Sequence, residues 1–316
     1  MGAFSFACIF ENRLYIREKK GMTMKKIFVL LLFLPLAVFC TGMYSFQEAQ
    51  RGAEQGSMLH QYVLAEYYAK GIGGVTPDLA KAAEWYKKSA EQGYALAQYE
   101  YAVFLETGRG AVKVDLPKAA EMYRKAADLG VPSAQVRMGI ALLYGELGFT
   151  QNGPKAVKYF ESAVAQGNVA AKIHLAGCYA AGLGVKQDLA KARSIYLHAA
   201  QSGDPAAMCA LGMFLIQQQE QTAALVWIRQ AARMGDGQGL YLLGFMEKDN
   251  RNMAAYFQQA AKRGYPYAYY SLGLCYYDGR GVEKNRKLAM KWIRRAAEAG
   301  VPEAQNFLDI SRKIGL

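Results

Sequence analysis

One short motif recurs along most of the chain: two small residues, two variable residues and a glycine. Its eight copies end at Gly56, Gly93, Gly130, Gly167, Gly203, Gly235, Gly264 and Gly300, with spacings of 37, 37, 37, 36, 32, 29 and 36 residues. Periods in this range are typical of stacked helical hairpins, in which each hairpin must share its apolar face with its neighbours. The repeats therefore predict one elongated array, although 316 residues would otherwise suggest about two globular domains.

Each repeat is predicted to contain two helices joined by a loop. A small residue follows the motif glycine after four positions and a large apolar residue after eight, as at Ala97 and Tyr101, so that both lie on one face of a first helix. Five repeats continue into a glycine loop, which ends the first helix because glycine adopts the left-handed conformation at little steric cost. These loops begin at Gly71, Gly108, Gly145, Gly182 and Gly279.

A second helix is predicted after each loop. Its expected N-caps are short polar residues whose oxygens accept free backbone N–H groups, namely Asp78, Asp115, Asp188 and Asn285. Trp85, Trp227 and Trp292 occupy one shared position of this helix, and we expect them in the core. Two repeats lack the glycine loop, so tight turns are expected at residues 217–221 and 247–251.

The repeat that ends at Gly300 carries the fullest version of the pattern. It reads Leu-Gly-Leu-Cys-Tyr-Tyr-Asp-Gly-Arg-Gly-Val from Leu272 to Val282, followed by Trp292 and by Ala-Ala-Glu-Ala-Gly. This resembles the Sel1-like repeat, and the resemblance recurs from about residue 44 to about residue 315, over about seven repeats. It implies an all-α fold, a right-handed α/α solenoid superhelix of hairpins related to tetratricopeptide repeats. It also implies an adaptor for other proteins, with no fixed reaction.

Some secreted Sel1-like proteins carry two cysteines per repeat that form disulfides, and a penicillin-processing activity is associated with that branch. The repeats of this chain contain only Cys178, Cys209 and Cys275, an odd number without paired spacing. The resemblance therefore does not extend to the disulfides, and stability is expected to come from packing alone.

The chain before the repeats is typical of an export signal. Lys25 and Lys26 precede thirteen uncharged residues, 27–39, which as a helix span about 20 Å, less than the ~30 Å of a hydrocarbon core. We expect an upstream extension at 1–23, a signal peptide at 24–42 and the repeat solenoid at 43–316, exported to the periplasm or outside the cell. The uncharged run reaches twenty residues if it is extended to Phe46, so an uncleaved membrane anchor is the alternative.

One position of the first helix carries unrelated side chains from repeat to repeat, so packing does not dictate it. The concave surface of a solenoid is its usual binding face. We therefore predict that this position lines a groove for a protein or peptide partner, the candidate residues being Glu100, Arg137, His174 and Ser271. A solvated flank is the alternative. The preceding position is mostly apolar, and we interpret it as core between repeats rather than as an aromatic binding stripe.

The positive charge of the chain is unevenly distributed. Of the net charge of +12, +4 belongs to the first 26 residues, which weakens the case for nucleic acid binding. The last hairpin is basic, and Lys287, Lys291 and Arg295 share one face of its second helix. We expect a polar terminal cap there. The alternatives are a surface for acidic lipid, for an acidic partner or for nucleic acid, and an export signal argues against the last.

Reactive side chains are scarce. None of the three histidines lies in a metal-ligand pattern, and His174 and Cys178, four residues apart on one helix, lack a third residue that would orient them. The sequence therefore predicts an exported protein-interaction scaffold with no catalytic residue, metal or cofactor. The alternatives are a cell-envelope enzyme acting on cell-wall peptides or β-lactams, and a membrane-anchored adaptor. The identity of the partner and the oligomeric state are left open.

Overall fold

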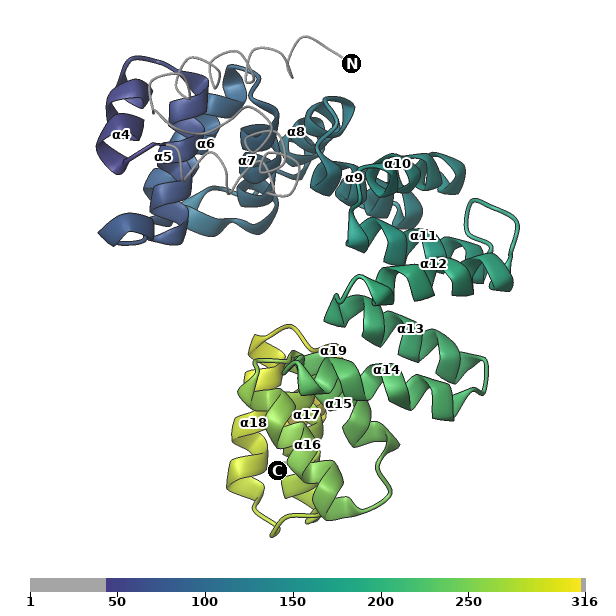
Figure 1. Cartoon of the computed structure of the whole chain (residues 1–316). Coiled ribbons are helices and arrows are strands. Elements are labelled where there is room, and N and C mark those ends of the chain that lie inside the picture. The colour runs from purple at the N-terminus through teal and green to yellow at the C-terminus, as the bar shows by residue number, and fades with distance from the viewer. Residues whose placement is uncertain (1–43, 314–316) are drawn as a thin grey trace, which may run out of the picture. The chain divides into compact units, whose positions relative to one another are not determined.

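The predicted hairpins are present throughout the part of the chain that the computed structural model describes, residues 44–313 (Figure 1). The predicted upstream extension and signal peptide, residues 1–42, lie outside it. The first helices of the repeats are α5 (Met58–Lys70), α7 (Ala95–Thr107), α9 (Pro132–Tyr144), α11 (Val169–Ala181), α13 (Pro205–Gln217), α15 (Gly237–Met246), α17 (Pro266–Asp278) and α19 (Pro302–Lys313). The second helices are α6 (Leu79–Glu91), α8 (Leu116–Asp128), α10 (Gly153–Ala165), α12 (Leu189–Gln201), α14 (Gln221–Arg233), α16 (Asn250–Lys262) and α18 (Arg286–Glu298).

The chain divides into two compact units, with the boundary between Asp115 and Leu116. The described part of the first unit holds α4 to α7 and the second holds α8 to α19, and within each unit consecutive helices pack on one another. The helix α4 (Phe46–Glu54), which the sequence analysis did not anticipate, carries the first copy of the repeated motif and packs on α5. All elements in residues 44–313 are helices, so the all-α solenoid prediction is confirmed.

The helix boundaries follow the predicted capping residues. Gly71, Gly108, Gly145, Gly182 and Gly279 end the first helices of five repeats, with φ between 64° and 80°. Asp78, Asp188 and Asn285 accept the backbone N–H three residues later, as N-caps do. In the two shorter repeats α13 ends at Gln217 and α14 begins at Gln221, while α15 ends at Met246 and α16 begins at Asn250. The predicted tight turns are therefore confirmed.

The second glycine of the loop has a different role from the first. A Cβ atom built on Gly281 would lie 1.8 Å from the carbonyl oxygen of Asn250, and one built on Gly184 would lie 2.1 Å from the carbonyl carbon of Gly153. Asn250 and Gly153 are the first residues of α16 and α10. The loop of one repeat thus touches the start of the preceding second helix, and only glycine permits that backbone approach.

Buried glutamines join neighbouring helices at the motif. Gln61, Gln98 and Gln135 are 5–7% exposed, and each donates its side-chain N–H to the backbone carbonyl of the second small residue of the motif, at 3.3–3.4 Å. These carbonyls belong to the last turns of α4, α6 and α8, where a helix lacks its own donors. Each carbonyl also accepts the backbone N–H of the motif glycine, so the glutamine adds a second hydrogen bond and links its first helix to the end of the preceding helix.

The core position of the second helix lies one residue after the tryptophans. Tyr86, Ile228 and Ile293 are at most 1% exposed, whereas Trp85, Trp227 and Trp292 are half-buried. Trp227 and Trp292 pack against the core clusters as partly buried side chains, so the expectation that the tryptophans lie in the core is confirmed only in part. Adjacent helical residues are about 100° apart around the axis, so the tryptophans lie at the edge of the buried stripe rather than at its centre.

Candidate functional site

The four predicted binding residues lie on first helices and are half-buried. Two of them pack on a ring of the preceding second helix. The Arg137 guanidinium lies 5.8 Å from the centre of the Tyr123 ring and forms an ion pair with Glu146, with 2.7 Å between Nη1 and Oε2. His174 stacks on Phe160 with 5.3 Å between ring centres. These residues are thus partly fixed by packing within the chain, and their binding role stays a prediction.

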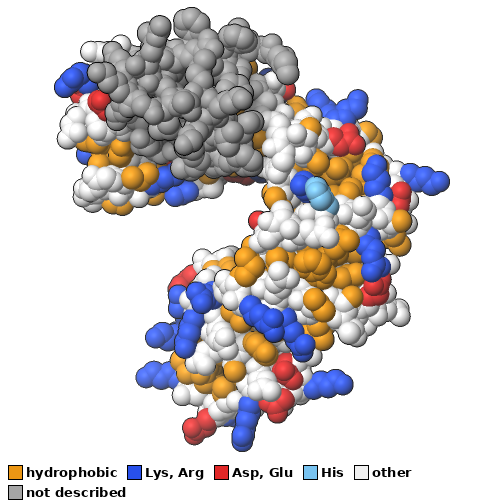
Figure 2. All heavy atoms as spheres, viewed as in Figure 1, with side chains coloured by type: hydrophobic (Ala, Val, Ile, Leu, Met, Phe, Trp, Pro, Cys, Tyr) orange, Lys and Arg blue, Asp and Glu red, His pale blue; other side chains and the backbone are white. Residues whose placement is uncertain are grey.

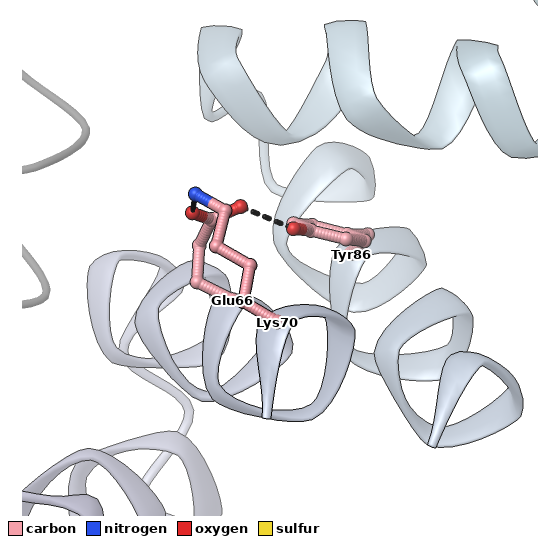
Figure 3. A network of polar contacts seen from close by, with 3 residues as sticks. All are labelled: Glu66, Lys70 and Tyr86. Carbon is pink, nitrogen blue, oxygen red and sulfur yellow. Dashed lines mark hydrogen bonds and ion pairs between the residues drawn. The ribbon is translucent and has the colours of Figure 1, made fainter. Parts of the chain in front are cut away.

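Glu100 belongs to a group of polar side chains inside the first unit that we call the carboxylate cluster: Glu66, Lys70, Tyr86 and Glu100. Glu66 on α5 is only 2% exposed. The Tyr86 hydroxyl donates a hydrogen bond to Oε1 of Glu66, and the Lys70 ammonium binds its Oε2 (Figure 3). Both oxygens of a buried carboxylate are therefore satisfied, as such a group requires.

The carboxylate cluster raises the pKa of Glu100. Burial is the main cause, the negative charge of Glu66 adds to it, and Lys70 and Arg109 oppose it, so that the pKa of Glu100 is about 7. Burial and Glu66 also raise the pKa of Tyr86 well above its ordinary value, so this phenol stays protonated and donates to the carboxylate. The first unit therefore holds a glutamic acid that titrates near neutral pH.

Sequence reasoning identified Glu100 but missed Glu66, although the repeat register carried a signal. The positions equivalent to Glu66 hold Val103, Ile140, Gly177, Met213, Phe245, Leu274 and Ile310. Glu66 is thus the one charged residue at an otherwise uncharged position. A charged side chain that replaces apolar ones in repeat register is a candidate for a buried polar group, which needs partners nearby.

A surface of clustered aromatic side chains lies on the first helices of the second unit. We call it the aromatic surface and define it as Met213, Tyr241, Phe245, Tyr265 and Tyr267. The Tyr241 ring is the centre, 4.8 Å from Phe245, 5.0 Å from Tyr265 and 6.3 Å from Tyr267 between ring centres. Ring pairs at these distances hold one another in place.

The outer members of the aromatic surface are exposed. Phe245 is 62% exposed, Tyr267 43% and Met213 37%, and the Gln238 amide donates to the Met213 sulfur at 3.8 Å. Figure 2 shows hydrophobic side chains reaching the surface of the second unit. Exposed apolar residues that gather in one place mark interaction sites more often than isolated ones do.

One predicted binding residue, Ser271, lies at the aromatic surface. Ser271 is half-buried beside the Tyr241 hydroxyl. Burial raises the pKa of Tyr241, and the hydrogen bond with Ser271 partly offsets this rise. Tyr241 itself occupies the position that we interpreted as core between repeats. The equivalent Tyr62 is buried, at 1% exposed, but Tyr241 is only half-buried, so that position contributes to both core and surface.

Cys178, Cys209 and Cys275 are buried in the second unit as free thiols. Burial raises the pKa of Cys178 to about 11, and it raises the pKa of Cys275 as well. Burial also lowers the pKa of His174, whose ring is occupied by stacking on Phe160. A nucleophilic cysteine needs a lowered pKa. The His174 and Cys178 pair therefore has the opposite electrostatics to a thiolate site.

Residues 44–313 contain no group of three or more His, Cys, Asp or Glu side chains placed to hold a metal ion. Within the same residues, no helix combines the length and the apolar character needed to cross a membrane.

Comparison with known proteins agrees with this geometry. The Sel1 repeat model matches seven segments, at 61–94, 95–131, 132–168, 169–204, 205–236, 238–265 and 266–301. The crystal structure of a Sel1 repeat protein from Oxalobacter formigenes is 27% identical, with a TM-score of 0.54, over 94% of this chain and 92% of that one.

Two curated relatives are similar over shorter stretches. An F-box protein of Arabidopsis thaliana is 32% identical over 105 residues, and the chitin synthase regulator SKT5 of Saccharomyces cerevisiae is 33% identical over 88 residues. These matches cover 32% and 25% of this chain but only 30% and 13% of the relatives. The whole-chain match to the crystal structure and the seven repeats agree with the helices and caps described above, and this chain belongs to the Sel1 repeat family.

Proposed function

We propose that this Sel1 repeat protein is an exported, non-catalytic scaffold that binds a protein or peptide partner on the face of its first helices, the concave face of a solenoid. The aromatic surface is the observation that carries the proposal. Its exposed rings, Phe245 and Tyr267, lie on α15 and α17, and the exposed Met213 lies on α13, all of which are first helices. One of the residues predicted to bind, Ser271, lies beside it.

The chemistry of the aromatic surface suits a partner with apolar side chains. Aromatic residues supply much of the binding energy of protein interfaces because they bury a large area with few rotatable bonds. Phe245 is held against Tyr241 and Phe257, with ring centres 4.8 Å and 5.5 Å away, so its exposed edge is presented in a fixed position. A partner therefore pays little entropy to order it.

Export and the absence of catalysis rest on other grounds. The sequence features of residues 24–42 support export, and one relative is named as a regulator of an enzyme rather than as an enzyme. Among the described residues, the buried thiols and the stacked His174 offer no activated nucleophile.

Capture from the native cell tests the binding proposal. The full chain with Phe245→Ala and Tyr267→Ala should lose captured partners that the unchanged chain retains, because truncating a central aromatic anchor typically costs about 2 kcal/mol or more, a factor of about 30 in Kd. Val226→Ala is the matched control, since Val226 is also 62% exposed but lies on the second helix α14. Equal capture by all three proteins would refute the proposal.

Two further measurements address export and catalysis. N-terminal sequencing of the mature protein should find a start near Met43, whereas a retained Lys25 would indicate the anchored alternative. Hydrolysis of a β-lactam or a peptidoglycan fragment by the purified protein, lost in His174→Ala, would replace the scaffold with the enzyme alternative.

A further inference from the structure

The last second helix, α18, has a charge unlike that of the others. It carries five Lys or Arg and one Glu, a net charge of +4, whereas every other second helix from α6 to α16 carries +1 or +2. The outer faces of α6 and α8 balance their charges internally, through the pairs Lys87 with Glu91 and Lys125 with Glu121. A solvated terminal face needs polarity but does not need charges of one sign, so packing does not account for α18.

The cations of α18 surround an open depression with an apolar floor. Its lining residues are Asn285, Lys287, Leu288, Lys291, Trp292, Arg294, Arg295 and Glu298. Leu288 and Trp292 are half-buried and form the floor, while the four cations are exposed. Lys287, Lys291, Arg294 and Arg295 form no ion pair with a carboxylate of the described chain. Glu298 is the one carboxylate among these lining residues, so the four cations leave the depression a net charge of +3 beside apolar surface.

Arg295 is held in position by two rings instead of by a carboxylate. Its guanidinium carbon lies 4.5 Å from the centre of the Tyr269 ring and 5.5 Å from that of Trp292, and the two rings stack at 5.8 Å with 22° between their planes. A guanidinium that rests on aromatic faces keeps its N–H donors free to bind a carboxylate in a bidentate manner. Arg295 is thus pre-ordered for an anion that the described chain does not supply.

The spacing of the cations matches an extended peptide. Lys287, Lys291 and Arg295 are four residues apart, which on an α-helix is about 6 Å along the axis. An extended chain advances about 3.3 Å per residue, so its alternate side chains, which point to the same side, are about 6.6 Å apart. Carboxylates at alternate positions of an extended peptide would therefore face one cation each.

A membrane surface fits less well than a peptide. The apolar residues Ala289, Ile293 and Ala296 of α18 are 0% exposed because they pack into the repeat, so they are not available for insertion into lipid. The half-buried Trp292 lies in the floor of the depression, with the charged residues around it. A narrow chain can reach such a floor, whereas a flat array of headgroups contacts mainly the rim.

We propose that the outer face of α18 is a second binding surface, separate from the aromatic surface, and that it takes an extended acidic peptide segment with Glu or Asp at alternate positions. Lys287, Lys291 and Arg295 bind the carboxylates, and Leu288 and Trp292 contact the side chains between them. This surface does not depend on the proposed role of the aromatic surface.

Fluorescence anisotropy on the full chain tests the proposal with a labelled short peptide of alternating Glu and Leu. The double variant Lys291→Gln and Arg295→Gln should raise Kd about tenfold or more, and binding of the unchanged chain should weaken with salt because exposed ion pairs are screened. Lys155→Gln with Lys158→Gln is the matched control, since it removes two exposed lysines from the second helix α10 and should leave Kd unchanged.

Further measurements decide the outcome. In a chain with Trp85→Phe and Trp227→Phe, the fluorescence of Trp292 should change on peptide binding, as contact with the floor requires. Equal losses in the control variant, or equal binding of a peptide with all its carboxylates in one block, would overturn the proposal. Tighter binding to phosphatidylglycerol vesicles or to single-stranded DNA than to the peptide would do the same.

Discussion

Replacing the buried acid Glu100 by its neutral isostere should stabilise the first unit at alkaline pH and leave it unchanged in acid. The pKa of Glu100 is raised from 4.5 to about 7 by burial first and by Glu66 second. Between these two values the folded chain therefore binds more protons than the unfolded chain. The contribution of Glu100 to stability is fully present below about pH 4.5 and is lost as the pH rises through about 7.

The size of this effect follows from the same two values. One pKa unit corresponds to about 1.36 kcal/mol, so ionised Glu100 costs the folded first unit about 3 kcal/mol above pH 7. Glu100→Gln removes the ionisation while keeping the shape of the side chain. The variant should match the unchanged protein at about pH 4 and exceed its free energy of unfolding by about 3 kcal/mol at about pH 8.5.

Urea unfolding followed by the fluorescence of Trp85 measures this difference, because Trp85 lies on α6 of the first unit. The background carries Trp227→Phe and Trp292→Phe, so that only the first unit reports. The exposed Glu84→Gln on the same helix is the control and should show no pH-dependent gain. A stability difference for Glu100→Gln that does not change with pH, or a loss at high pH, would refute the assignment of Glu100 as a buried acid beside Glu66.

Three further predictions concern the second unit. Gly281→Ala should cost about 2 kcal/mol or more, because φ is 72° and the new Cβ would meet the Asn250 carbonyl. Gly300→Ala, with φ of 84° and nothing within 4 Å of the new Cβ, should cost only about 1 kcal/mol. Thermal unfolding compares the two variants, and equal losses of stability would contradict the close approach of Gly281 to Asn250. Gln135→Ala should cost about 1 kcal/mol in urea unfolding, because the Ala127 carbonyl and the Gln166 amide each lose one of two partners. An unchanged midpoint would argue against this link between α8 and α9. Iodoacetamide should label none of Cys178, Cys209 and Cys275 in the folded protein at about pH 8 and all three after unfolding. The reason is that burial both hides these thiols and raises their pKa. Rapid labelling of Cys178 in the folded state would instead support a reactive thiolate at that position.

The candidate surfaces differ in how far sequence alone could identify them. The three cations on one face of α18 followed from spacing, because Lys287, Lys291 and Arg295 lie four residues apart on one helix. Spacing could not show that these cations lack carboxylate partners. It also could not show that Arg295 packs on Tyr269 and Trp292, since Tyr269 comes from another helix. The aromatic surface could not be identified from the sequence either, because its rings come from α15, from α17 and from Tyr265 at the N-cap of α17.

The sequence by itself determined the number of hairpins, the positions of their caps and the loop at each first-helix end. These features are local: a helix of about thirteen residues and its cap depend on residues within a few positions of one another, and the pattern recurs in seven repeats, five of them with the capping glycine. Only the tertiary structure decided that Tyr86 and not Trp85 lies between the helices, and that Glu66 is buried beside Glu100. Burial and electrostatics depend on which side chains different helices bring together, and the repeat pattern, which treats every helix alike, does not contain that information.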